Sequence, residues 1–222
     1  TTSSPPNLAV LAGNGKPRML TDLDANLLDH ITLGKVEEIT VKSSADGRDI
    51  QAWVVTPPGF DPAKKYPLLL EIHGGPFAAY GPWFAPEIQL YAAAGYVVVY
   101  ANPRGSTGYG TEFANLIENA YPGQDYDDLM SVVDATIARG SIDTDNLFVT
   151  GGSGGGALTA WIVGHTDRFR AAVSAKAAYD SLKTRVVKHG RAPEDVAILP
   201  GIMPIIGKTD AEAKAQLDKL QG

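Results

Sequence analysis

The sequence predicts an α/β domain with a mostly parallel β-sheet and helices on both of its faces. Three observations favour this fold class: an early pair of β-rich runs, several continuous apolar runs bounded by Gly and Pro, and helical periodicity between those runs. Continuous apolar runs are typical of parallel strands that are buried on both faces. The chain has 222 residues, of which 44% are apolar, and this length supports one domain with a sizeable core.

The domain is expected to open with a β-hairpin. Residues 1–35 are polar and rich in Pro, Asn and Gly, and we interpret them as a linker with one short strand. Residues 36–43 and 50–58 are β-rich, and the Asp-Gly pair between them is typical of a hairpin turn.

Strands and helices are then expected to alternate, as in a parallel α/β sheet. Buried strands are predicted over residues 66–75, 95–105, 146–153 and 170–177, and helices over residues 126–140 and 155–166. The first helix has one apolar face, made by Leu129, Val132, Val133 and Ile137. Sheets of this kind bind ligands outside the carboxyl ends of their strands. His73, Arg104 and Ser153 each follow a predicted strand or lie at its end, so we expect them on one rim.

The stretch "VTGGSGGGAL", residues 149–158, contains the pattern G-x-S-x-G at Gly151, Ser153 and Gly155. This pattern is typical of a nucleophile elbow, in which a serine occupies a strained turn between a strand and a helix. Its neighbours must lack side chains so that the strand and the helix can approach each other. The predicted strand before Ser153 and the predicted helix after it provide the required context.

A phosphate-binding glycine loop is the alternative interpretation of this stretch. No lysine follows the glycines, which excludes the P-loop pattern. Gly152, Gly154 and Ala157 approach the dinucleotide pattern, which also requires an acidic residue at the end of the next strand. Asp180 lies beyond the end of that predicted strand. The residues therefore favour the nucleophile elbow.

The His-Gly-Gly stretch at residues 73–75 supports a hydrolase, because hydrolases place one backbone donor of the oxyanion hole after the third strand. Gly154, directly after the serine, supplies the second N–H. The His73 side chain is expected to hold the shape of its loop by hydrogen bonds.

Composition excludes several other classes of protein. Lys and Arg total 19 against 25 Asp and Glu, and the resulting net charge of −6 argues against a nucleic-acid partner. The absence of cysteine excludes disulfides, Cys-ligated zinc and a thiol nucleophile. No apolar run approaches the roughly 20 residues of a membrane span, so no membrane partner is expected. No cofactor or metal is expected, and the sequence does not indicate a cellular compartment.

Four segments resemble the catalytic domain of the prolyl oligopeptidase family, in its acylaminoacyl-peptidase and dipeptidyl-peptidase branches. They read "EIHGGPFAAYG", "YANPRGSTGYGTEF", "DDLMSVVDATIARGSIDTDNLFVTGGSGGG" and "TDRFRAAVSAKA". The resemblance implies an α/β-hydrolase fold, Ser153 as nucleophile, an oxyanion hole made by the N–H groups of Gly75 and Gly154, and Arg104 as a loop-organising residue. Residues 1–35 look like the end of a preceding β-propeller. The family usually has a large residue after the serine, so Gly154 is expected to open the pocket.

The resemblance ends near residue 180, and the Asp and His motifs that the family places later in the chain are not present. Residues 184–222 instead resemble a segment of the bacterial-luciferase-like flavin monooxygenases, with a strand "ILPGIMPIIG" and a helix opened by Thr209 and Glu212. That segment holds no complete flavin site, so no flavin chemistry is expected. We therefore expect a hybrid chain: an α/β-hydrolase core over residues 36–183, incomplete at its C-terminal end, and a foreign strand-helix tail. The alternative is an ordinary family member with a divergent end.

The expected function is acyl hydrolysis of a small ester or peptide through an acyl-enzyme on Ser153. The only histidine after the last predicted core strand is His189, and with Asp180 it obeys the Ser…Asp…His order of this fold. The activity is expected to be weak because the usual acid and base are missing. The alternative is an inactive fragment that acts as a structural, self-assembling module. An exposed sheet edge also predicts a homo-oligomer.

Overall fold

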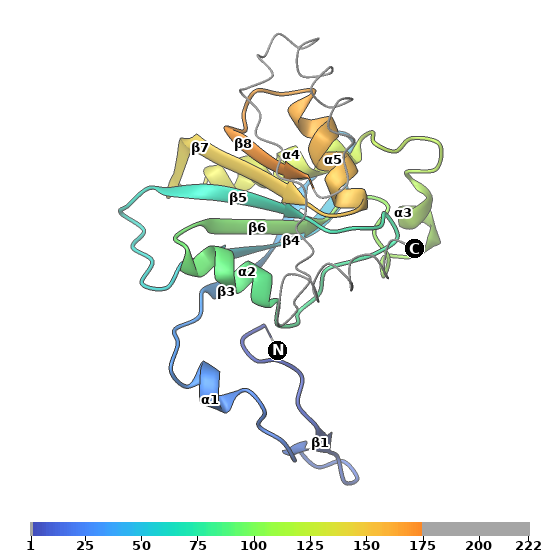
Figure 1. The fold of residues 1–222 in the computed structure, drawn as a ribbon. Coiled ribbons are helices and arrows are strands. Elements are labelled where there is room, and N and C mark those ends of the chain that lie inside the picture. The colour runs from blue at the N-terminus through green and yellow to red at the C-terminus, as the bar shows by residue number, and fades with distance from the viewer. Residues whose placement is uncertain (1, 175–222) are drawn as a thin grey trace, which may run out of the picture.

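The computed structural model describes residues 2–174, which form a six-stranded sheet with helices packed on it (Figure 1). Its strands are β3 (Lys35–Lys42), β4 (Asp49–Thr56), β5 (Tyr66–Ile72), β6 (Val97–Asn102), β7 (Ile142–Gly151) and β8 (Ala171–Ser174). They lie in the order β3-β4-β6-β5-β7-β8. The pairs β6–β5, β5–β7 and β7–β8 are parallel, whereas β3–β4 and β4–β6 are antiparallel. The predicted α/β fold with a mostly parallel sheet is confirmed.

The expected hairpin is formed by β3 and β4, with Lys42 opposite Asp49 at its closed end. Gly47 in the turn has a φ of 75°, a left-handed conformation that favours glycine. Its N–H donates to the carbonyl of Ser43 at 2.8 Å. The Asp-Gly pair therefore marks the turn as predicted.

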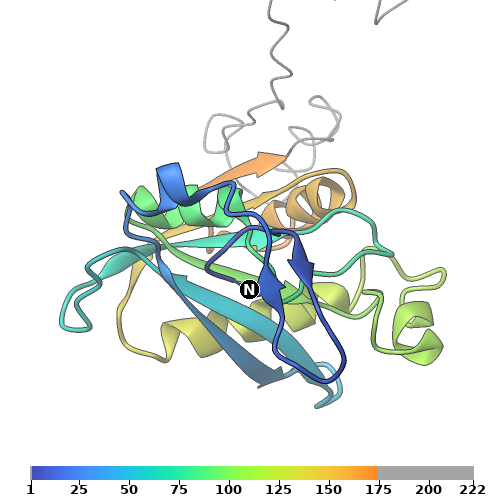
Figure 2. The ribbon, with the colours of Figure 1, turned by 90° about the horizontal axis from the view of Figure 1, so that it is seen from below.

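Helices cover both faces of the sheet, as Figure 2 shows from below. Helices α4 (Asp125–Ile137) and α5 (Gly154–Val163) pack on one face, and α2 (Pro86–Ala93) packs on the other. Successive strand residues point to opposite faces, so Val97 and Val99 join the cluster under α4 and α5, whereas Val98 joins the cluster under α2. Burial of each such aliphatic side chain stabilises the fold by about 1.5–3 kcal/mol. This double cover explains the continuous apolar runs in the sequence.

Helix α4 follows the predicted periodicity: Leu129, Val132 and Val133 are fully buried against the sheet. Its first turn carries Asp125, Asp127 and Asp128, and negative charge at the N-terminus stabilises a helix through its interaction with the helix dipole. The helix ends at Ile137, before Gly140, which has a φ of 92°.

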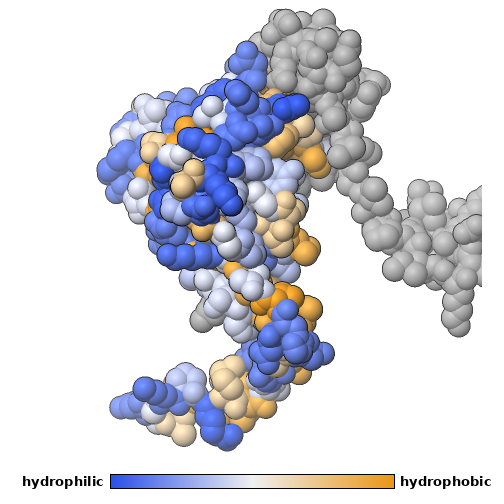
Figure 3. Space-filling view, turned by 90° about the vertical axis from the view of Figure 1, so that its left-hand side faces the viewer, coloured by the Kyte–Doolittle hydropathy of each residue, from blue (hydrophilic) through white to orange (hydrophobic). Residues whose placement is uncertain are grey.

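The N-terminal segment differs from the predicted linker with one short strand. It contains two short strands that pair antiparallel, β1 (Ala9–Val10) and β2 (Arg18–Met19), and one helical turn, α1 (Ala25–Leu28). This arm extends away from the sheet (Figure 1) and exposes several apolar side chains (Figure 3), among them Leu8, Leu11, Leu20, Leu23 and Leu27. It joins the domain at Gly34, whose N–H and C=O are both bound by the buried side-chain amide of Gln89 on α2, at 2.7 and 3.2 Å.

A further helix, α3 (Thr111–Asn115), lies between β6 and α4. None of the described helices is long and apolar enough to span a membrane. The predicted tail, residues 184–222, lies outside the described residues, as do Asp180 and His189.

Candidate active site

The order in which the chain adds strands to the sheet changes direction at β5. From β5 it passes to β6 on one side, and from β6 it returns across β5 to β7 on the other side. Ligands of open α/β sheets bind at such a switch point, outside the carboxyl ends of the strands. The loop beginning at His73 follows β5, and Ser153 follows β7. Segments that are far apart in sequence therefore meet at this position.

Ser153 occupies a sharp turn between the last residue of β7 and the first residue of α5. Its backbone angles are φ 55° and ψ −115°, and a positive φ is rare for a residue that has a side chain. Such a conformation costs about 1–3 kcal/mol and is held by the surrounding structure. The residue is exposed, and no residue within the described range 2–174 hydrogen-bonds its hydroxyl. Its geometry is that of a nucleophile elbow.

The glycines on both sides of Ser153 allow very close backbone packing. A Cβ on Gly155 would lie 2.1 Å from the carbonyl oxygen of Ile72 and 2.6 Å from that of His73. A Cβ on Gly151 would lie 2.6 Å from the carbonyl oxygen of Gly155. Since real Cβ atoms do not approach backbone so closely, any side chain at either position would separate α5 from the ends of β5 and β7. The spacing G-x-S-x-G thus has a direct steric basis in this chain.

Gly154 does not open a pocket, contrary to the expectation from the sequence. A Cβ on Gly154 would lie 2.4 Å from the carbonyl oxygen of Gly75 and 2.9 Å from its nitrogen. The backbone of the loop after β5 fills the space that a larger side chain would need. The sequence indicates the missing side chain but not the loop that takes its place, because that loop comes from a distant part of the chain.

Two backbone amides lie beside Ser153. Among residues 2–174, no acceptor is bound by the N–H of Gly75 or by that of Gly154. A Cβ on the neighbouring Gly74 would lie 3.3 Å from the Cβ of Ser153 and 3.9 Å from its Oγ, so the loop runs directly past the hydroxyl. N–H donors next to a serine hydroxyl, bound to no acceptor among the described residues, are the groups from which an oxyanion hole is built.

The His73 ring is engaged within its own loop. Its Nδ1 lies 2.7 Å from the carbonyl oxygen of Gly74, and its Nε2 lies 3.0 Å from the hydroxyl of Ser106. The ring also makes an edge-on contact with Tyr80, with 5.2 Å between the ring centroids. Burial lowers the pKa of His73, which favours the neutral ring. With both nitrogens occupied, His73 shapes the loop and does not serve as a base for Ser153.

Arg104 connects three separate segments beneath the rim. Its guanidinium binds Asp128 on α4, at 2.9 Å from Nε and 2.8 Å from Nη2. Nη2 also lies 3.3 Å from Asp46 and 3.2 Å from Ser43, both in the turn of the β3–β4 hairpin. The hydrogen bonds and the negative charge of Asp128 raise the pKa of Arg104. This buried cation fixes the loop after β6 against the start of α4.

The described histidines provide no base for Ser153. His165 follows α5 at the end opposite to Ser153, about 15 Å away along a helix of this length, and its ring stacks on Trp161. His30 lies in the N-terminal arm. Within residues 2–174 there is also no cluster of His, Asp and Glu side chains that could hold a metal ion.

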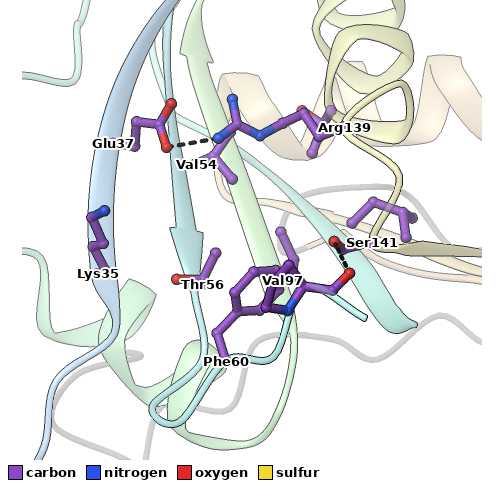
Figure 4. Close-up of a pocket in the computed structure, with 11 residues that line it drawn as sticks. Lys35, Glu37, Val54, Thr56, Phe60, Val97, Arg139 and Ser141 are labelled. Atoms are coloured by element: carbon purple, nitrogen blue, oxygen red, sulfur yellow. Dashed lines mark hydrogen bonds and ion pairs between the residues drawn. The ribbon is translucent and has the colours of Figure 1, made fainter. Parts of the chain in front are cut away.

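A cavity of about 280 Å³ lies at the opposite end of the sheet (Figure 4). Its polar side chains are largely engaged with each other and with the backbone: Arg139 pairs with Glu37 at 2.7 Å, and Ser141 donates to the carbonyl of Pro62 at 3.2 Å. Ser141 precedes β7 and Ser153 follows it, and β7 runs beside β5 from Tyr66 to Ile72, so about 20 Å of extended strand separates the cavity from the elbow. This cavity is therefore not part of the site at Ser153.

The sheet order and the serine elbow define a protein of the α/β-hydrolase class. The sequence matches the prolyl oligopeptidase family over residues 82–192, which is half of the chain. The chain belongs to the prolyl oligopeptidase family.

Relatives and solved structures agree with this assignment. The uncharacterized peptidase YuxL of Bacillus subtilis is 46% identical over 158 residues, which cover 71% of this chain and 24% of that protein. Dipeptidyl-peptidase 5 of Porphyromonas gingivalis is 33% identical over 172 residues, covering 77% of this chain and 25% of that protein. The crystal structure of the Pyrococcus horikoshii acylaminoacyl peptidase superposes with a TM-score of 0.72 at 29% identity, covering 78% of this chain and 28% of that one. The chain thus spans about a quarter of the length of these relatives.

Proposed function

We propose that this chain carries the nucleophile and the oxyanion hole of a serine peptidase or esterase. The observation that supports this most directly is the exposed Ser153 hydroxyl, held at a strained elbow beside the N–H groups of Gly75 and Gly154, neither of which binds an acceptor among residues 2–174. An activated acyl group that enters this position meets a nucleophile on one side and two hydrogen-bond donors on the other.

The reaction proceeds in two steps. Ser153 Oγ bonds to the carbonyl carbon, its proton passes through a base to the leaving amine or alcohol, and the C–N or C–O bond breaks. Water then attacks the acyl-enzyme, releases the acid and returns a proton to Oγ. Each N–H that binds the oxyanion in the transition state lowers the barrier by about 3 kcal/mol.

His189 is the proposed base, and Asp180 is the acid that orients it. Both assignments come from the order of residues in the chain, which matches the order Ser…Asp…His of α/β-hydrolases. Without a functioning base, an oxyanion hole and substrate binding retain a residual rate enhancement of about 10³–10⁴ over water. We therefore propose activated esters as the best test substrates.

Peptides are the proposed natural substrate class. The relatives include proteins named dipeptidyl-peptidase and acylaminoacyl peptidase, two names that refer to cleavage of peptide bonds. We also propose that the chain forms a homo-oligomer through the edge of its sheet. Within residues 2–174, β8 pairs on one side only, with β7, and an edge strand is a surface on which a second chain can pair.

A fluorophosphonate probe tests the proposed nucleophile. We expect the wild-type chain to be labelled covalently and the Ser153→Ala variant to remain unlabelled. Ser44→Ala is the matched control, because Ser44 is an exposed serine in the hairpin turn and its loss should leave labelling unchanged. Equal labelling of wild type and Ser153→Ala, or no labelling of the folded wild type, would contradict the proposal and favour the inactive, structural alternative.

A further inference from the structure

The hydroxyl of Tyr121 donates a hydrogen bond to the carbonyl oxygen of Gly154, at 2.6 Å. Tyr121 lies between α3 and α4, and Gly154 directly follows Ser153. We propose that Tyr121 is a positioning residue that holds the nucleophile elbow, with Ser174 as a second anchor. This inference rests on the proposed function of Ser153 and adds to it a residue outside the G-x-S-x-G stretch.

The start of α5 needs an external anchor because its own sequence is permissive. The helix begins with Gly154, Gly155 and Gly156, and glycine loses more conformational freedom on folding than any other residue. The residue before them, Ser153, is strained. A flexible run next to a strained turn does not fix the direction of the Gly154 N–H by itself.

Two side chains from outside the helix bind this glycine run. The Tyr121 hydroxyl reaches the carbonyl of Gly154, and the Ser174 hydroxyl at the end of β8 donates to the carbonyl of Gly156 at 2.8 Å. The two bonds are made on either side of Gly155, whose backbone packs on the end of β5. Together they hold the first turn of α5, and with it the N–H that faces the oxyanion.

The residues around Tyr121 and the turn that follows it define its position. Tyr121 is half-buried and lines a small cavity of about 10 Å³, together with His73, Arg104, Ser106 and others. Asp125, four residues later, accepts hydrogen bonds from Gly123 N–H at 2.6 Å and Tyr126 N–H at 3.0 Å, which fixes the turn into α4.

Burial raises the pKa of Tyr121 to about 12, so its hydroxyl remains a protonated donor at neutral and mildly alkaline pH. The same loop adjoins the Arg104–Asp128 pair, because Arg104 also binds Gln124. The buried network around Arg104 thus extends through this loop to the elbow.

Tyr121→Phe tests the inference, since it removes the hydroxyl and keeps the ring. We expect the rate of fluorophosphonate labelling and kcat for p-nitrophenyl acetate to fall about tenfold, the effect of one lost hydrogen bond, with KM nearly unchanged. Tyr66→Phe is the matched control: the Tyr66 hydroxyl accepts a hydrogen bond from Asp61 N–H at 2.9 Å, at the opposite end of the sheet. It should affect Tm but not the labelling rate.

The outcomes separate the two proposals. If wild type is labelled, Ser153→Ala is not, and folded Tyr121→Phe is labelled at the wild-type rate, the inference about Tyr121 is wrong and the nucleophile stands. If wild type is not labelled, the proposed function itself fails. Should Tyr121→Phe not fold, Ser174→Ala tests the same anchoring: a severalfold slower labelling at unchanged Tm supports it, and an unchanged rate overturns it.

Discussion

Arg104 and Asp128 form a bidentate ion pair. The exposed fraction of the side chain is 2% for Arg104 and 0% for Asp128. Asp128 Oδ2 also accepts the backbone N–H of Arg104 at 2.8 Å. One carboxylate therefore fixes both the side chain and the backbone of the loop after β6. Neither residue touches Ser153, yet both lie beneath the rim on which it is presented.

Asp128→Asn is expected to destabilise the domain by about 3–5 kcal/mol, because it leaves the buried Arg104 cation with only the partly exposed Asp46 carboxylate, 3.3 Å from Nη2, as a counter-charge. The free energy of unfolding from urea titration measures this. Asp127→Asn is the control, one residue away on the first turn of α4 and without an ion pair among residues 2–174. It should lose at most about 1 kcal/mol through the helix dipole. Equal losses in the two variants would show that Arg104 does not depend on Asp128.

Gly155→Ala and Gly154→Ala are expected to destabilise the fold by about 1–3 kcal/mol, the usual effect of forcing extra atoms into a packed site. The added methyl groups would meet the carbonyl oxygens of Ile72 and Gly75, at 2.1 and 2.4 Å. Thermal unfolding measures the loss.

Gly152→Ala serves as the control, since a Cβ at Gly152 meets no atom within 4 Å. Its Tm should stay within a few degrees of wild type, or rise slightly because the unfolded chain loses freedom. A loss at Gly152 as large as at Gly155 would contradict the steric account of the elbow.

Glu71 predicts a specific dependence of stability on pH. Burial raises its pKa from an ordinary value of 4.5 to about 8, with a smaller contribution from the negative charge of Glu87, and its Oε2 has no hydrogen-bond partner among the described residues. The folded state therefore holds a proton that the unfolded state releases. Its contribution to stability is complete below about pH 4.5 and is lost as the pH rises toward 8.

Glu71→Gln should remove this pH dependence, so the variant should gain stability over wild type by up to about 1.4 kcal/mol per pH unit across that window. Urea titrations at pH 5, 6.5 and 8 measure how the free energy of unfolding of each protein changes with pH. All other titratable groups are the same in the two proteins, so the difference between them reports on Glu71. Glu112→Gln, an exposed glutamate on α3, is the control and should follow wild type. A parallel course of wild type and Glu71→Gln would show that Glu71 is already ionised in the folded protein.

The proposed base and acid are tested by His189→Ala and Asp180→Asn. If they assist Ser153, turnover of p-nitrophenyl acetate should fall by about 10²–10⁴ for the histidine, the usual contribution of general-base catalysis. His165→Ala is the control, because that ring stacks on Trp161 at the far end of α5. Unchanged turnover in both test variants would mean that another group, or water, accepts the serine proton.

The six strands of the main sheet and the two longest helices were predictable because each has a strong local signal, whereas the paired short strands β1 and β2 were not predicted. The Asp-Gly pair located the hairpin, and apolar runs over residues 66–75 and 95–105 located β5 and β6, which are buried on both faces. Helix α2 was not predicted: it begins at Pro86 and lacks a clear apolar stripe, because Gln89 is buried while Leu90 is exposed. The position of Gln89 depends on its hydrogen bonds to Gly34, a contact between residues far apart in sequence.

The elbow was predictable as a motif, whereas its surroundings were not. G-x-S-x-G between a strand and a helix is a local pattern, and the positive φ of Ser153 follows from it. The contact of Gly154 with Gly75 and the hydrogen bond from Tyr121 join segments that only the folded chain brings together. Tyr121 had no signal in the sequence, because a tyrosine in a Pro-Gly loop has many structural roles.

Ile72 at the end of β5 pairs with Gly151 at the end of β7. This register places the loop after β5 and the serine turn after β7 at the same position along the strands. Each residue of slippage between neighbouring strands displaces one strand by about 3.3 Å along the other, which exceeds the length of a hydrogen bond. An insertion in β5 or β7 would therefore carry the serine out of reach of the Gly75 amide, even with every residue of the site intact. The irregularity in this pairing lies between Tyr66 and Leu68, at the opposite end of the strands. The register is regular from Leu68 to Ile72, next to the loop that carries Gly75 and the turn that carries Ser153.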